Sequence, residues 1–117
     1  MANLDPATAS GEELLAAMQA YCVERGASDI HTSPERDSVR IEIRLDGLLQ
    51  PLRTITKDDY ETLIRKVKFE SKLKLNIQNI PQDGQYSFRH GERLVNVRVA
   101  TLPTRCGETM TLRFLDP

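Results

Sequence analysis

Residues 98–113 read RVATLPTRCGETMTLR, and this stretch decides the fold. Apolar and polar side chains alternate on both sides of a loop that contains Pro103 and Gly107, as they do in half-buried strands. Arg98 alternates with valines before the loop, and Arg113 alternates with apolar residues after it. The stretch therefore predicts two strands, each of which carries an arginine on the side opposite its apolar face.

Further strands are predicted on both sides of this pair. Residues 39–45 alternate strictly, and the turn pair Asp46-Gly47 predicts a hairpin that returns through residues 48–52. Pro51 places that return strand at a sheet edge, because proline has no N–H to donate to a neighbour. Residues 27–34 predict a short extended piece.

A second hairpin is predicted directly before the opening stretch. Residues 85–89 and 93–101 are both strand-like, and the chain is expected to turn between them at His90-Gly91. Residues 80–84 are expected to form a loop before the first of these strands.

Two segments have helical spacing. Ser10 and Glu13 match a capping box at the start of the first, and Gly26 is placed to end it. Thr56 is the expected N-cap of the second, whose apolar stripe weakens after Phe69. The order of elements predicts an α+β domain with a largely antiparallel, hairpin-linked sheet and two main helices packed on it.

The whole chain reads as one domain of a soluble protein. Its 117 residues carry a net charge of −1, so a dedicated duplex-DNA binder, which usually has a marked basic excess, is not expected. No apolar run approaches the ~20 residues of a membrane span, and no signal pattern is present, so we expect a cytoplasmic location. Residues 1–9 predict a flexible arm or linker and residues 10–117 the domain, which ends just past a strand like a piece of a longer protein.

Cysteine and histidine give little support to a metal site. Cys22 and Cys106 belong to no CxxC pattern, so reduced thiols are expected, although a disulfide between them stays open. His90 is expected in a surface turn. His31 is predicted either to hydrogen-bond a neighbouring carboxylate or carbonyl, or to lie near a bound nucleotide or partner. Asp29 could equally be a cap or turn residue.

Four arginines on predicted strands form the main candidate set: Arg40, Arg44, Arg98 and Arg113. Each could be a solvated surface charge or pair with an acidic neighbour such as Glu42, Asp83 or Glu108. Each could equally hold an anion, because the planar guanidinium matches phosphate in a bidentate geometry. The alternation alone leaves both interpretations open. The chain contains no phosphate-binding P-loop motif and no recognisable nucleophile motif, so no catalytic residue is assigned.

Four sequence pieces in register resemble one known domain. The pieces are GASDIH…P at 26–34, VRIEIRLDGLL at 39–49, IPQDGQYSF at 80–88 and VRVATLPTRCGETMTLRFLD at 97–116. Together they resemble the second N-terminal, PAS-like domain that precedes the motor domain in type II secretion and type IV pilus assembly ATPases. The resemblance covers about residues 20–117. The chain departs from the family pattern at Thr32-Ser33, Gln85 and Ala100 and over residues 72–79.

The resemblance implies a function for the arginines. Such ATPases are hexamers in which ATP and Mg²⁺ are bound by the P-loop motor domain, and arginines of this domain reach the terminal phosphate. The matching positions are Arg98 and Arg113, with Arg40, Arg44 and His31 as second-rank nucleotide or interface residues. The implied partners are the motor domain, the neighbouring subunits and an inner-membrane platform protein, with the assembly peripheral at that membrane. No hydrolysis is expected from this chain alone.

Two other functions stay open from the residues. A PAS-like small-ligand sensor would need an apolar internal cavity, which the 5% aromatic content disfavours. A single-stranded nucleic-acid binder would need aromatic side chains between the arginines for base stacking, and only Tyr86 and Phe88 are near enough in sequence.

Overall fold

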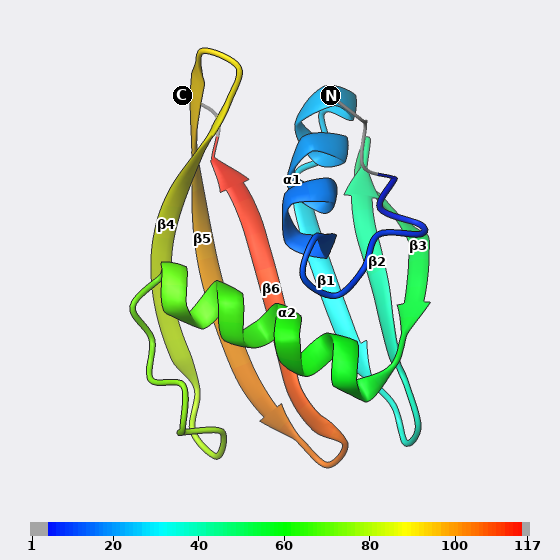
Figure 1. Ribbon diagram of the computed structural model, residues 1–117, viewed down its shortest axis with the longest axis vertical. Coiled ribbons are helices and arrows are strands. Elements are labelled where there is room, and N and C mark those ends of the chain that lie inside the picture. Colours follow the sequence, from blue (N-terminus) through cyan, green and yellow to red (C-terminus); the bar gives the residue numbers. More distant parts are fainter. Residues whose placement is uncertain (1–4, 116–117) are drawn as a thin grey trace.

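The computed structural model, which describes residues 5–115, contains one antiparallel sheet with two helices on one of its faces (Figure 1). The elements in chain order are α1 Leu14–Arg25, β1 Asp29–Pro34, β2 Val39–Leu45, β3 Leu48–Ile55, α2 Lys57–Glu70, β4 Gln82–His90, β5 Arg93–Thr104 and β6 Gly107–Leu115. Since α1 and α2 both lie in front of the sheet, no helix among residues 5–115 lies on its other face. The predicted α+β class and hairpin-linked sheet are confirmed.

The six strands are ordered β3-β2-β1-β6-β5-β4. Four pairs are hairpins of consecutive strands, whereas β1 pairs with β6, which is far from it in sequence. This pairing joins the first half of the chain to the last strand. The edge position expected for the strand that contains Pro51 is confirmed, and the register of β2 and β3 shifts between Ile41 and Glu42 beside it.

The turn between β2 and β3 lies where the sequence predicts it, and the turn between β4 and β5 lies close to its predicted position. Asp46 and Gly47 have φ of 52° and 80°, the left-handed pair that a two-residue hairpin requires. The other turn lies at Gly91 and Glu92, one residue later than expected, because His90 is still paired with Arg93. β4 also begins at Gln82, so part of the expected loop at residues 80–84 belongs to the strand.

The core lies between the sheet and the helices. Every strand except β3 turns alternate residues toward α1 and α2, including Ile30, Ile41, Val97 and Leu112, each at most 2% exposed. These β-branched and leucine side chains fit a pleated surface that is covered on one side. The residues between them point to the uncovered face. The alternation in the sequence therefore places the apolar residues in the core and the arginines on the uncovered face.

The two helices begin differently from each other. The oxygen of Thr56 accepts a hydrogen bond from the Asp59 N–H at 3.1 Å, as expected of the α2 N-cap. The capping box expected at Ser10 is wrong, because α1 begins only at Leu14 and its N-cap makes no side-chain bond. Ser10 Oγ instead donates to the Glu13 carboxylate at 3.2 Å, so both side chains are used before the helix starts.

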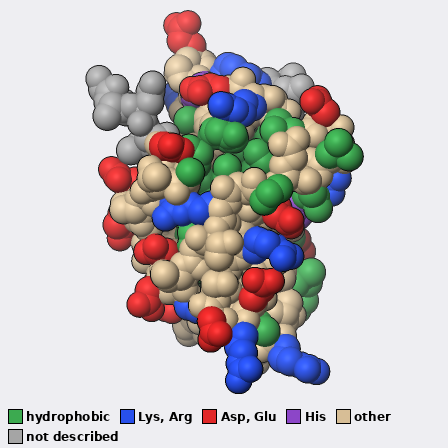
Figure 2. All heavy atoms as spheres, turned by 90° about the vertical axis from the view of Figure 1, so that its right-hand side faces the viewer, with side chains coloured by type: hydrophobic (Ala, Val, Ile, Leu, Met, Phe, Trp, Pro, Cys, Tyr) green, Lys and Arg blue, Asp and Glu red, His purple; other side chains and the backbone are tan. Residues whose placement is uncertain are grey.

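The segment before α1 contacts the edge strand. Arg53 Nη1 donates to the carbonyl oxygens of Pro6 and Ala9 at 3.2 and 2.7 Å, and both of these residues are buried. Residues 1–4, also part of the arm predicted from sequence, lie outside the described residues. Figure 2 looks onto the β3 side and shows hydrophobic side chains gathered in its upper part.

Candidate functional site

A row of polar side chains crosses the face of the sheet that the helices leave uncovered. The strand registers place opposite one another, in order, Gln85 of β4, Arg98 of β5, Arg113 of β6, Asp29 of β1 and Arg44 of β2. Residues that are directly opposite on antiparallel strands have Cβ atoms about 4.5–5.5 Å apart. Three of the four candidate arginines therefore lie in one line of adjacent positions.

The carboxylate of Asp29 is the centre of this row. Its Oδ2 lies 2.8 Å from His31 Nε2 and 3.4 Å from Arg44 Nε, and its Oδ1 lies 4.0 Å from Arg113 Nε. Asp29 is only 3% exposed although it belongs to the uncovered face. Its three neighbours therefore shield it from water, and their charges and N–H groups take the place of hydration.

The surroundings of Asp29 favour its ionised form. Burial by itself raises the pKa of this carboxyl, but hydrogen bonds from Ser28 and His31 and the charges of His31 and Arg113 together outweigh that effect. The net result is a pKa below the ordinary value of 3.8. Asp29 is therefore a carboxylate at neutral pH, with one negative charge among several arginines.

Arg98 and Arg113 are not fully neutralised, because Arg113 shares the Asp29 carboxylate with Arg44 and Arg98 has no acidic partner within residues 5–115. They are opposite each other on β5 and β6, both side chains are exposed, and the register places Gln85, an uncharged residue, on the far side of Arg98. Within residues 5–115, Arg98 makes no ion pair or hydrogen bond. Like charges in directly opposite positions are destabilising. An anion placed between the two guanidinium groups would remove that repulsion.

The second-rank candidates divide into two groups. Arg44 and His31 belong to the Asp29 cluster, and Thr111 Oγ1 lies 3.5 Å from the second ring nitrogen of His31. Arg40 is on the same face but apart from that cluster, 3.3 Å from Glu35 and 4.0 Å from Glu42. The predicted pairing of His31 with a nearby carboxylate is thus present.

Sequence reasoning missed Asp29, which it interpreted as a cap or turn residue. The spacing Asp-Ile-His already places Asp29 and His31 on one strand face. The arginines come from β2 and β6, however, and their approach depends on β1 lying between those two strands. A sequence contains no direct signal for that order.

A second polar cluster lies on the helix side, between α2 and β6. Lys68 Nζ lies 2.6 Å from Glu108 Oε1 and donates to the Ile77 carbonyl at 3.0 Å. The Tyr60 hydroxyl donates to the Glu108 carbonyl at 2.7 Å and lies 2.8 Å from Thr32 Oγ1. These buried bonds fasten the second helix to the two central strands of the sheet.

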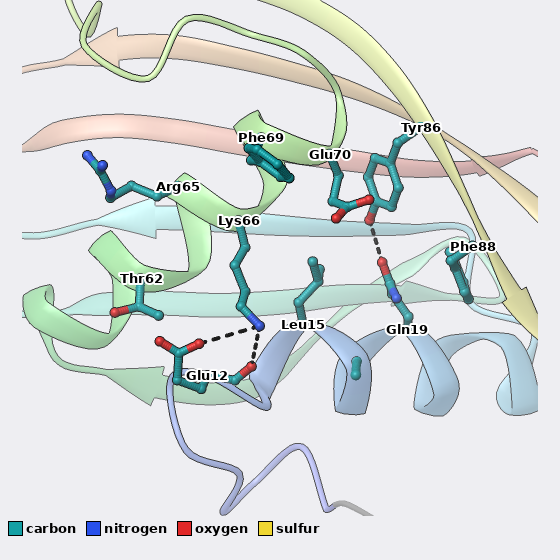
Figure 3. A pocket seen from close by; sticks show the side chains of 11 residues that line it. Glu12, Leu15, Gln19, Thr62, Arg65, Lys66, Phe69, Glu70, Tyr86 and Phe88 are labelled. Atoms are coloured by element: carbon teal, nitrogen blue, oxygen red, sulfur yellow. Dashed lines mark hydrogen bonds and ion pairs between the residues drawn. The ribbon is translucent and has the colours of Figure 1, made fainter.

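A groove lies between α1 and α2 above β4, with a volume of about 680 Å³ (Figure 3). Tyr86 at its floor donates a hydrogen bond to Gln19 at 2.6 Å, and Lys66 of α2 reaches across to Glu12. Phe88 lines the same groove. The two aromatic residues that a nucleic-acid site would need thus lie on the face opposite the arginines, where they cannot alternate with them in base stacking.

Within the range 5–115, no helix is long and apolar enough to cross a membrane. The same residues contain no group of three or more His, Cys, Asp or Glu side chains that could hold a metal ion.

Known proteins resemble this chain over most of its length. The profile of a family described as "Type II/IV secretion system protein" matches residues 6–117. The type II secretion system ATPase E of Vibrio cholerae is 36% identical over 104 residues, which are 89% of this chain and 21% of that protein. The protein transport protein HofB homolog of Escherichia coli is 38% identical over 104 residues, 89% of this chain and 23% of that protein.

One further relative and one solved structure also match. The type IV pilus assembly ATPase PilB of Thermus thermophilus is 38% identical over 89 residues, which cover 76% of this chain and 10% of that protein. The chain thus spans less than a quarter of these three relatives. The crystal structure of the ATPase DotB of Legionella pneumophila superposes with a TM-score of 0.63 at 19% identity, over 95% of this chain and 31% of that one. That likeness shows a shared fold.

Proposed function

The chain belongs to the type II/IV secretion system protein family, and from this membership we propose that it places arginines on ATP bound by the motor domain of a secretion or pilus assembly ATPase. The resemblance inferred from the four sequence pieces is confirmed at the level of the family. In this proposal residues 10–117 form a regulatory domain before the motor, and Arg98 and Arg113 contact the terminal phosphate.

The observation that carries the proposal is the exposed pair Arg98 and Arg113 on the uncovered face. Two guanidinium groups lie opposite each other, and the Asp29 carboxylate, 4.0 Å from Arg113, is shared with Arg44, so the excess positive charge of this surface favours an anion. During phosphoryl transfer, negative charge is spread over the three outer oxygens of the terminal phosphoryl group. Arginines that reach such a group accelerate transfer by about 10³–10⁵ in enzymes that use them.

The remaining parts of the proposal follow from the family and are supported by the chain's own composition. ATP and Mg²⁺ would be held by the motor domain, because this sequence has no P-loop motif and its described residues form no metal cluster. The neighbouring subunits of a hexamer and an inner-membrane platform protein are the proposed partners, in the cytoplasm at that membrane. Arg40, in an ion pair with Glu35 and away from the row that contains Arg98 and Arg113, suits a subunit interface.

The test is ATP hydrolysis by the full-length ATPase that contains this chain. We expect Arg98→Ala and Arg113→Ala each to lower kcat by about 10²–10³, the effect of removing one donor from a developing charge, with KM for ATP within about threefold. Lysine should rescue only in part, since it keeps the charge and loses the fork. Arg89→Ala is the matched control, because Arg89 is an exposed arginine of the same face on edge strand β4.

The proposal fails if Arg98→Ala and Arg113→Ala hydrolyse ATP at the parental rate. It also fails if Arg89→Ala lowers kcat as much as they do, since a general loss of positive charge would then explain the result.

A further inference from the structure

We propose that Asp29 is a positioning residue, which holds Arg113 at its Nε so that the terminal amino groups of that arginine remain free for a phosphate. The inference rests on the function proposed above and adds a third residue to it. Asp29 itself would not touch ATP. Its role would be to fix where one of the two phosphate-contacting side chains lies.

The first argument is the way in which the carboxylate is shared. β1 lies between β2 and β6, so Asp29 has an arginine directly opposite it on each side. Its Oδ2 is 3.4 Å from Arg44 Nε, and its Oδ1 is 4.0 Å from Arg113 Nε. Each oxygen therefore faces one arginine, and both arginines are approached at the nitrogen nearest the chain.

The second argument is the difference between the far ends of the two arginines. Arg44 Nη1 donates to the Gly47 carbonyl at 3.0 Å. Arg44 therefore has a partner both at Nε and at its terminal nitrogen, and it stabilises the β2–β3 hairpin. The terminal nitrogens of Arg113 have no partner within residues 5–115. The Arg113 side chain is also the more exposed, at 64% against 37% for Arg44. Arg113 thus has an ion-pair contact with Asp29 at its base, at 4.0 Å, and is open at its tip.

The third argument is that Asp29 is itself fixed. The His31 ring lies 2.8 Å from its Oδ2, and Arg44 Nε donates to the same oxygen at 3.4 Å. A buried carboxylate with these bonds cannot turn freely. A flexible arginine held against it loses much of the conformational entropy that a phosphate contact would otherwise have to remove. Arg98 lacks such an anchor, so the two arginines would differ in stiffness.

The experiment uses the full-length ATPase with Asp29→Asn, which keeps the size of the side chain and removes its charge. A displacement of about 1 Å in a positioned group can cost up to about 10²-fold. We expect kcat to fall by about 10- to 100-fold with KM for ATP within about threefold. In an Arg113→Ala background, Asp29→Asn should cause no further loss, whereas in an Arg98→Ala background it should still lower kcat.

Glu42→Gln is the matched control. Glu42 is a carboxylate on the same face, opposite His31 in the register, and it is 4.0 Å from Arg40 instead of Arg113. Its neutralisation changes the charge of the face by the same amount, and we expect the parental kcat. Asp29→Glu is a second variant, which keeps the charge and moves the carboxylate by one methylene, and it decides the question if Asp29→Asn does not fold.

The outcomes separate the two hypotheses. Parental kcat for both Asp29 variants, or a loss that is as large without Arg113 as with it, overturns the positioning role while the arginine proposal stands. Parental kcat for Arg98→Ala and Arg113→Ala overturns the proposed function, and the positioning role with it. A loss confined to proteins that retain Arg113 supports the inference.

Discussion

Lys68 and Glu108 form an ion pair that is almost removed from solvent, at 1% and 8% exposure. A pair of this kind adds little net stability, because desolvation offsets most of the attraction between its charges. The loss of one partner alone has a larger effect, since it leaves the other charge buried without compensation. Glu108 Oε2 already has no hydrogen-bond partner within the described range, so no other group there would replace the amine.

We therefore expect Lys68→Met to lower the free energy of unfolding of this chain by about 3–5 kcal/mol. The double variant Lys68→Met with Glu108→Met should recover much of that loss, because the buried charge is then absent. Lys66→Met is the control: its ion pair with Glu12 is solvent-exposed, and such pairs contribute about 0–1 kcal/mol. Urea denaturation followed by circular dichroism gives all three values. Similar small losses for Lys68→Met and Lys66→Met would contradict this account.

The two cysteines should differ strongly in reactivity. Both thiols are free, Cys22 is buried in α1, and Cys106 is exposed in the β5–β6 turn. Burial raises the pKa of Cys22 to about 12 against a smaller opposing effect of the Arg25 charge, so its reactive thiolate is nearly absent at pH 8. Titration with an aromatic disulfide reagent at pH 8 should release one equivalent of the reagent's thiolate per native chain and none from native Cys106→Ser. The denatured parental chain should release two equivalents. Rapid labelling of native Cys22 would show that the first helix does not pack as described.

At the scale of the elements, the two helix starts give a matched pair of substitutions. Thr56→Ala removes the hydrogen bond to the Asp59 N–H, and the loss of such a cap costs about 1 kcal/mol. Ser10→Ala removes a bond between two exposed side chains that caps no helix, so the change should stay within about 0.5 kcal/mol. Equilibrium unfolding of the two variants compares them directly. An equal loss at Ser10 would restore the capping box that the sequence predicts.

The contrast between these helices also shows what local sequence can and cannot determine. Turn residues, alternation and the Thr56 cap act over a few neighbours, so the sequence predicts the β2–β3 turn, the β4–β5 turn to within one residue and the start of α2. The start of α1 is not predicted correctly, because Ser10 and Glu13 match a local pattern and yet bond to each other's side chains. The arginine face followed from the same alternation. The Asp29 cluster did not, because it requires β1 and β6 to pair across most of the chain.

At the scale of the whole molecule, the domain has two faces with different tasks. The helix side is held by the apolar core and by the Lys68 cluster, whereas the uncovered face carries the row that contains Arg98, Arg113 and Asp29. A surface that exposes two like charges in water has limited affinity of its own, because the high dielectric weakens each contact with an anion. Under the proposed function, the strength of a phosphate contact would therefore come largely from a motor domain that presents the nucleotide.

This division predicts the behaviour of the 117-residue chain alone. It should hydrolyse no ATP, because it has no P-loop to hold the nucleotide. It should bind ATP only at about millimolar concentrations, and binding should disappear in ~1 M salt, where the Debye length is about 3 Å. Titration of the ¹⁵N-labelled chain with ATP should shift amide signals of β5 and β6 around Arg98 and Arg113, and Arg98→Ala should weaken those shifts. Arg89→Ala should leave them unchanged. Tight, salt-insensitive binding that instead shifts the amide signals of residues lining the α1–α2 groove would place the nucleotide on the opposite face. That result would contradict both the proposed function and the role of Asp29.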